Sequence, residues 1–265
     1  MVAWMRAVAV LVWLGVLQGG ARAEAEVDVA LALAVDVSYS MDPDEQALQR
    51  QGFAEAFRSG SVHEAIRSGS LGRITVTYFE WAGVGHQQVV VPWTVIDGEA
   101  GALAFAERLE RAPIGRVFYT SISGAIDFGV ELMARKGAAA TREVIDVSGD
   151  GPNNAGRPVT EARDAAVAQG ITVNGLPIML KRPSSAWDIE NLDLYYRDCV
   201  IGGSGAFLVP VRERSQFAAA IRTKIVREIA SLPLPVQPAR AEPAREEGGA
   251  DCLVGERLRR QRSWE

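Results

Sequence analysis

The fold is decided by residues 27–45, which read VDVALALAVDVSYSMDPDE. Nearly every residue from Val27 to Val35 is apolar, as expected for a β-strand that is covered on both faces. The end of the stretch is typical of a helix start, because Asp42 can cap the helix, Pro43 fits its first position and Glu45 can complete a capping box. The stretch therefore predicts a buried strand that leads through a short polar loop into a helix.

Strand and helix patterns alternate along the rest of the chain. Helical patterns run from residue 42 to about 57 and over 98–109, 121–135, 160–169, 191–198 and 215–230, and strand patterns occupy 73–81, 88–93, 143–148, 171–178 and 206–211. This alternation predicts a doubly wound α/β fold, with a mostly parallel sheet and helices on both faces. Residues 88–93 follow a Gly-containing loop and are expected to form an antiparallel edge strand.

The two ends of the chain differ from its middle. Residues 1–23 carry an unbroken apolar run from Ala7 to Leu17 and a small-x-small cleavage site, a pattern typical of a secretory signal peptide rather than of a membrane anchor. Residues 233–265 are rich in Pro, Ala, Glu and Arg and predict a disordered tail. One domain over residues 24–232 is therefore expected, in a protein that is periplasmic or secreted.

Charge and cysteine content narrow the classes of partner. The 265 residues include 28 Lys and Arg and 33 Asp and Glu, with a net charge of -5, so a nucleic-acid partner is not expected. An oxidising compartment permits a bridge between the two cysteines, Cys199 and Cys252. Because Cys252 stands in the polar tail, the sequence leaves the bridged and the unbridged state open.

Polar side chains follow two of the predicted strands where each strand ends. Asp36 follows the first buried strand, and Asp150 follows a later one. In a doubly wound sheet these strands would be neighbours at the switch point, so both carboxylates would share one crevice. Ser38 and Ser40 stand beside the first carboxylate, and Thr120 precedes a predicted helix. These five side chains predict an all-oxygen site that suits Mg²⁺, with Mn²⁺ or Ca²⁺ as competitors.

The charge of the predicted site indicates binding rather than catalysis. Three neutral hydroxyls and two carboxylates would leave a divalent cation incompletely neutralised and with a free position. A carboxylate from an Asp or Glu of a partner protein would complete the ligand shell. We therefore expect a non-enzymatic module that captures an acidic group, and we assign no catalytic residue.

These residues, in this order and on this alternation of strands and helices, resemble the metal-ion-dependent adhesion site of von Willebrand factor type A domains. The segments SGDG (148–151), YYRDC (195–199) and IGG (201–203) further resemble an uncharacterised bacterial group of exported A-like domains. The resemblance covers about residues 26–230 and implies a six-stranded A-domain fold with metal-mediated protein binding.

By this resemblance the hydroxyls of Ser38, Ser40 and Thr120 would touch the metal, and Asp36 and Asp150 would act directly or through water. The sequence departs from the A-domain pattern in two places. Bulky residues 117–119 (VFY) precede Thr120, where A domains often have glycine, so Ser121 is an alternative ligand. Glycine also stands at position 149 in place of the usual threonine.

Two other functions remain open at this stage. A metal-assisted hydrolase could use the same crevice, but it needs a placed general base, and the two histidines, His63 and His86, are expected to be structural or surface residues. A structural A-like domain that has lost its metal is the third hypothesis. Trp81 and Trp93 flank the edge hairpin and are expected to be buried beneath a helix.

Overall fold

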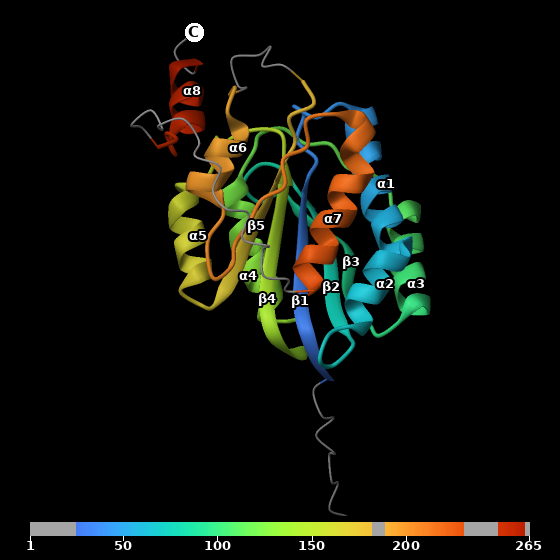
Figure 1. Cartoon of the computed structure of the whole chain (residues 1–265). Coiled ribbons are helices and arrows are strands. Elements are labelled where there is room, and N and C mark those ends of the chain that lie inside the picture. Colours follow the sequence, from blue (N-terminus) through green and yellow to red (C-terminus); the bar gives the residue numbers. More distant parts are fainter. Residues whose placement is uncertain (1–24, 182–188, 231–248, 263–265) are drawn as a thin grey trace, which may run out of the picture.

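A five-stranded sheet forms the middle layer of the molecule (Figure 1). The structure is a computed structural model that describes residues 25–181, 189–230 and 249–262. The strand order is β3-β2-β1-β4-β5. The strands are β1 (Ala25–Asp36), β2 (Ile74–Trp81), β3 (Gln87–Ile96), β4 (Ala138–Gly149) and β5 (Ile171–Pro177). All neighbours pair in parallel except β2 and β3, so the predicted α/β fold with an antiparallel edge strand is confirmed.

Helices cover both faces of this sheet (Figure 1). One face carries α1 (Pro43–Arg58), α2 (Gly60–Arg67), α3 (Glu99–Arg111) and α7 (Phe217–Ala230), and the other carries α4 (Ile122–Met133), α5 (Val159–Val167) and α6 (Leu192–Tyr195) with a π-helical turn (Tyr196–Val200). A last helix, α8 (Val254–Arg262), lies beyond α6. Within the described ranges, no helix combines the length and the apolar character that a membrane span requires. The predicted signal peptide, residues 1–23, lies outside the described residues.

Strand β1 lies in the centre of the sheet and is buried on both faces. Its alternating side chains divide between the two cores, because successive residues of a strand point to opposite faces. Leu31 and Leu33 join the core beneath α1 and α7, while Ala32 and Ala34 join the core beneath α4. The predicted doubly covered strand is therefore confirmed.

The loop after β1 ends at the predicted capping box. The backbone N–H of Glu45 donates to Asp42 Oδ1 (2.8 Å), and the N–H of Asp42 donates to Glu45 Oε2 (2.9 Å). Pro43 occupies the start of α1, as predicted. The sequence did not reveal α2, which begins directly after α1, because Ser59 ends one helix and caps the next through Val62 N–H.

The predicted strand over residues 206–211 is not a regular sixth strand. The segment does run beside β5, since Gly175 N–H donates to Phe207 O, and Val211 N–H donates to Pro177 O. A regular parallel ladder would also need an N–H at residue 177, which proline lacks. The sheet of the described chain therefore has five strands, and the segment joins it through isolated bridges.

The prediction of a disordered tail over residues 233–265 is wrong for the part that the structure describes. Residues 249–262 include α8, and Cys252 forms a disulfide with Cys199, 53 residues earlier in the chain. The polar composition of residues 249–262 favoured disorder. The helix forms because long-range contacts hold it, not because it carries an apolar stripe of its own. Residues 231–248 and 263–265 lie outside the described residues.

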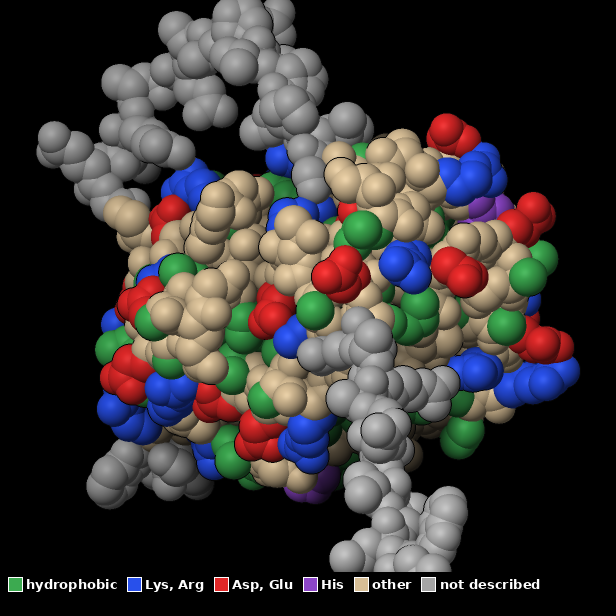
Figure 2. Space-filling view, turned by 90° about the horizontal axis from the view of Figure 1, so that it is seen from below, with side chains coloured by type: hydrophobic (Ala, Val, Ile, Leu, Met, Phe, Trp, Pro, Cys, Tyr) green, Lys and Arg blue, Asp and Glu red, His purple; other side chains and the backbone are tan. Residues whose placement is uncertain are grey.

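Surface charges are mixed at the end of the molecule where β1 begins. Figure 2 views this end from below, and Lys and Arg side chains are interspersed there with Asp and Glu side chains.

Trp81 is fully buried, and Trp93 is partly buried with its indole N–H donating to Leu132 O (3.0 Å). Burial of both tryptophans beneath a helix was the predicted outcome.

A buried ionic cluster joins β4 to α7. Lys224 Nζ lies 2.8 Å from Asp146 Oδ1 and also pairs with Glu228, and all three side chains are about 1% exposed. Asn174 donates to Glu228 Oε2 (2.7 Å) from β5. One cation therefore compensates two carboxylates inside the protein, where an uncompensated charge is very costly.

We predict that Lys224→Met destabilises the protein by about 3 kcal/mol, because it leaves two buried carboxylates without a cation. Urea denaturation followed by circular dichroism measures the change. The control is Lys136→Met, which removes a partly exposed pair with Glu143 and should cost less than about 1 kcal/mol. Equal effects of the two substitutions would contradict the predicted role of Lys224.

We also predict that Cys252→Ser lowers the free energy of unfolding by about 2–4 kcal/mol, because the bridge to Cys199 restricts the unfolded chain. The same variant should expose α8 to trypsin, which mass spectrometry of the early fragments detects. Unchanged protease resistance of residues 254–262 would show that the helix does not depend on the bridge.

Candidate functional site

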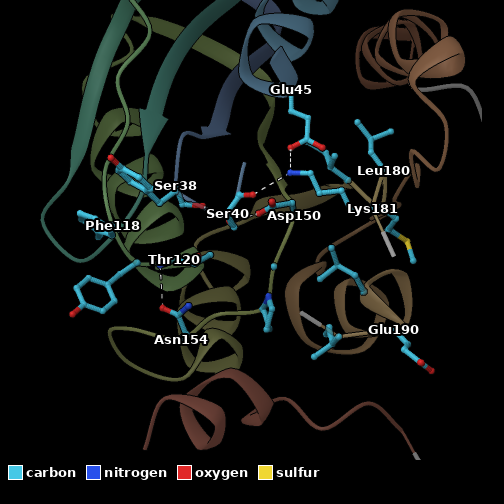
Figure 3. A pocket seen from close by; sticks show the side chains of 18 of the residues that line it. Ser38, Ser40, Glu45, Phe118, Thr120, Asp150, Asn154, Leu180, Lys181 and Glu190 are labelled. Atoms are coloured by element: carbon cyan, nitrogen blue, oxygen red, sulfur yellow. Dashed lines mark hydrogen bonds and ion pairs between the residues drawn. The ribbon is translucent and has the colours of Figure 1, made fainter. Parts of the chain in front are cut away.

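The predicted site residues converge at the carboxyl ends of β1 and β4. These strands are adjacent and in register, with Val35 opposite Ser148. A pocket of about 710 Å³ opens at this edge of the sheet, and its lining includes Ser38, Ser40, Thr120 and Asp150 (Figure 3). The convergence follows from the topology, because parallel neighbours end at the same edge.

A chain of hydrogen bonds joins the first loop to the second carboxylate. The backbone N–H of Ser38 donates to Asp36 Oδ1 (2.7 Å). The hydroxyls of Ser38 and Ser40 are 2.8 Å apart, and Ser40 Oγ donates to Asp150 Oδ1 (2.6 Å). Two hydroxyls and one carboxylate are therefore held within contact distance of one another at the pocket.

Asp36 lies beneath the pocket rather than in its wall. The side chain is fully buried, and its Oδ2 atom has no hydrogen-bond partner among the described residues. Burial, reinforced by the negative charge of Asp150, raises the pKa of Asp36 well above its usual value. A buried carboxylate oxygen without a donor is a group that a bound cation, or water on that cation, would satisfy.

Glycine at position 149 is required by its neighbours. A Cβ atom there would lie 2.9 Å from Asp36 Oδ2, 3.0 Å from the Tyr196 hydroxyl and 3.3 Å from the Trp81 ring. The hydroxyl of Tyr196 is also buried without a hydrogen-bond partner among the described residues. The departure from the A-domain pattern at this position therefore accompanies two bulky side chains that fill the space under the site.

Thr120 is fixed at the pocket by a loop from the other side. Its backbone N–H donates to Asn154 Oδ1 (3.0 Å), and the N–H of Asn154 donates to Thr120 O (2.9 Å), so two hydrogen bonds hold its backbone in place. The alternative residue, Ser121, caps α4 by accepting from Gly124 N–H and donates its hydroxyl to Ala155 O (2.9 Å). Because Ser121 is engaged in the fold, Thr120 remains the better candidate ligand.

Lys181, which was not among the predicted site residues, lines the pocket. The Lys181 ammonium pairs with Glu45 and lies 3.4 Å from both Asp42 Oδ2 and the carbonyl oxygen of Ser40 (Figure 3). Burial lowers the pKa of Lys181, but the carboxylates of Glu45 and Asp42 outweigh it and raise the pKa above its ordinary value. A signal was present, since Lys181 follows the predicted strand 171–178 and thus leaves the sheet at the same edge.

The rest of the pocket wall is largely apolar. Ile178, Met179, Leu180, Ile189 and Leu192 line it beside the oxygen cluster. The pocket therefore offers an apolar surface next to a polar centre, as binding sites commonly do.

Neither histidine belongs to the site. His63 is buried in α2 with its Nε2 atom 2.8 Å from Phe57 O, and His86 is exposed in the hairpin between β2 and β3. In the described ranges, no three His, Cys, Asp or Glu side chains cluster as metal ligands. The candidate metal centre thus rests on two carboxylates together with hydroxyl groups.

Comparisons with known proteins place the chain in a family. The model of a family described as a protein of unknown function (DUF1194) matches residues 26–233. No curated protein matches the sequence.

Solved structures with the same fold include a thread matrix protein of the mussel byssus and two pilus proteins. Proximal thread matrix protein 1 from the mussel byssus, described with a zinc-occupied metal-ion-dependent adhesion site (MIDAS) motif, is 12% identical with a TM-score of 0.52, over 78% of this chain and 49% of its own. The pilus adhesin SpaC from Lactobacillus rhamnosus GG is 12% identical with a TM-score of 0.55, over 77% of this chain and 30% of its own.

The von Willebrand factor domain of the pili tip protein Mfa5 from Porphyromonas gingivalis is 10% identical with a TM-score of 0.52, over 75% of this chain and 94% of its own. This chain spans half or less of the length of the mussel protein and of SpaC, and at these identities the likeness shows the fold alone. The chain therefore belongs to the family described as a protein of unknown function (DUF1194), and it has the fold of von Willebrand factor type A domains.

Proposed function

We propose that the protein is an exported binding module that captures an acidic group of a partner protein through a bound divalent cation. The observation that carries this proposal is the oxygen cluster of Ser38, Ser40 and Asp150 at the mouth of the pocket, above the unpartnered Oδ2 atom of Asp36. Adhesin-like neighbours with the same fold support a protein partner.

The residues present fit a hard cation. Ser38, Ser40, Thr120 and Asp150 would hold the ion from the pocket wall, and Asp36 would act from beneath, directly or through water. Hydroxyl and carboxylate oxygens suit Mg²⁺, Mn²⁺ or Ca²⁺. When bound, the ion supplies a positive charge with an open position, to which the carboxylate of a partner Asp or Glu can attach.

We infer a binding role rather than a catalytic one. Catalysis of hydrolysis would need a base placed beside the metal ligands. Neither histidine lines the pocket, Glu45 is engaged by the Asp42 N–H and by Lys181, and Glu190 lies across the pocket from the hydroxyl cluster (Figure 3). The sequence features of residues 1–23 add a proposal of export to the periplasm or beyond the cell.

We predict that the immobilised protein retains its partner from an extract of the exported proteins in Mg²⁺ and releases it in EDTA. Ser40→Ala should lower the retained amount at least about tenfold, because it removes a ligand and breaks the link to Asp150. The matched control, Ser61→Ala on the exposed start of α2, should bind as the wild type does. Retention that is indifferent to EDTA would overturn the proposal.

We further predict that Asp36→Asn raises the stability of the metal-free protein and removes its stabilisation by Mg²⁺. In chelator the variant should be more stable by about 1 kcal/mol, because a neutral amide avoids burying a charge. Added Mg²⁺ should raise the melting temperature of the wild type and leave that of the variant unchanged. The control is Asp44→Asn, at an exposed position in the first turn of α1.

The sign of the pH dependence follows from the raised pKa of Asp36. The folded metal-free protein holds the Asp36 proton more tightly than the unfolded chain does, so its stability should fall as the pH rises from the ordinary value of 3.8 through the raised one. Asp36→Asn should lack this part of the decline. Urea denaturation in EDTA at a series of pH values gives the free energy of unfolding of both proteins. If this free energy changed with pH in the same way in both, the assignment to Asp36 would be refuted.

A further inference from the structure

Three exposed aromatic side chains, named here the aromatic ridge, line the pocket beside the oxygen cluster. Tyr39 and Phe118 stack with their ring centroids 4.2 Å apart and their planes within 4°, and Tyr119 follows Phe118 in the chain. Their exposed fractions are 47%, 62% and 56%. Large rings in contact with solvent lose the benefit of burial, so a ridge of three next to a pocket is typical of a binding surface.

The backbone holds this ridge at a cost. Tyr119 has a φ of 71°, in the left-handed region, which costs a residue with a Cβ about 1 kcal/mol or more. The neighbouring hairpin fits against it only because Gly83 has no side chain, since a Cβ there would lie 2.8 Å from Phe118 O and 3.2 Å from Tyr119 Cβ. Strain of this kind persists where the surrounding structure enforces it, and it concentrates at functional sites.

A guanidinium group stands at each end of the ridge. The Arg116 guanidinium lies 4.0 Å from the centroid of the Tyr39 ring, and that of Arg259 lies 4.8 Å from the centroid of the Tyr119 ring. Both arginine side chains are exposed, and neither forms an ion pair with a described carboxylate. Other cations near the pocket are paired, such as Lys181 with Glu45 and Arg212 with Asp193.

Each of these arginines also touches one side of the candidate metal site. Arg116 donates to the carbonyl oxygens of Tyr39 (3.1 Å) and Met41 (3.2 Å), which flank Ser40. Arg259 donates from α8 to Asn154 O (3.2 Å), on the loop that pairs with Thr120. One positive charge therefore contacts the loop that carries Ser38 and Ser40, and the other contacts the loop that pairs with Thr120.

We propose that the protein binds an acidic polypeptide segment of its partner, in which one carboxylate reaches the metal and flanking carboxylates pair with Arg116 and Arg259 across the aromatic ridge. This proposal rests on the proposed function and specifies its partner. Two guanidinium groups without an ion pair among the described residues favour a ligand with more than one anionic group. Aromatic rings together with arginine are also the composition typical of protein interfaces.

The test uses the intact protein and two fluorescein-labelled peptides. One peptide has a central Asp with Glu and Phe residues on both sides, and its control has Gln in place of every Glu. Fluorescence anisotropy in low salt with Mg²⁺ gives the dissociation constants. Arg116→Ala and Arg259→Ala should each weaken the acidic peptide about 3- to 5-fold, as expected for a partly exposed charge pair, and leave the Gln peptide within about twofold.

Matched variants separate the specific contacts from net charge and from folding. Arg257→Ala removes a charge from the same helix, where that residue pairs with Asp251, and should leave both affinities within about twofold. Calorimetric titration with Mg²⁺ should give the same affinity for Arg257→Ala as for the wild type. If an arginine variant weakened both peptides equally, the residue would be structural and the proposal would be wrong.

The outcomes also distinguish this inference from the proposed function. Peptide binding that is lost in EDTA but indifferent to both arginine variants would overturn the acidic-segment proposal and leave the metal-dependent module standing. Arginine-dependent binding that survives EDTA would overturn the metal-dependent module and the metal contact of the segment, and would leave only the pairing of its carboxylates with Arg116 and Arg259. Binding to vesicles of anionic phospholipid with the same arginine dependence, together with no binding of the acidic peptide, would assign the surface to a membrane and overturn the proposal.

Discussion

The parallel pairing of β1 with β4 is the constraint on which the candidate site depends. β1 is the central strand of the sheet, and its register with β4 places Asp36 and Asp150 at one edge of the sheet although 114 positions separate them in the chain. The apolar residues of β1 and β4 stabilise this pairing far below the pocket. Two carboxylates that repel one another are thus held together by hydrophobic burial elsewhere.

Loops on this sheet supply most of the polar side chains that the pocket presents. The loop after β1 brings Ser38 and Ser40, the loop before α4 brings Thr120, and the segment after β5 brings Lys181. Local contacts fix the positions of these loops, such as the hydrogen bonds between Thr120 and Asn154. Close packing adds to this at Gly149, where there is no room for a Cβ atom. The site is therefore built from loops that the strands beneath them and their own hydrogen bonds position.

Much of this arrangement could be predicted from the sequence, because it follows from periodicity and local chemistry. The unbroken apolar run from Val27 to Val35 predicted the central strand, and the spacing of Asp42 and Glu45 predicted the start of α1. The meeting of Asp36 and Asp150 followed from the rule that parallel strands end at the same edge. These features need no knowledge of distant contacts.

Features that depend on distant contacts could not be predicted. Residues 206–211 have the composition of a strand, but the missing N–H of Pro177 interrupts the ladder. Residues 249–262 have the composition of a disordered tail, but a disulfide and contacts to the Asn153–Asn154 loop hold α8 in place. Arg116 and Arg259 are ordinary charged residues in sequence, and only the fold sets them at the two ends of one aromatic ridge.

The bridge between Cys199 and Cys252 links the last helix to the domain only after the cysteines have been oxidised. Cys252 is synthesised after all five strands, and its bond to Cys199 requires an oxidant. In a reducing environment the sheet can assemble, but α8 lacks its covalent tether and Arg259 its fixed place over Tyr119. The oxidation state of one cysteine pair thus reaches the binding surface, because it decides whether α8 is covalently held to the domain.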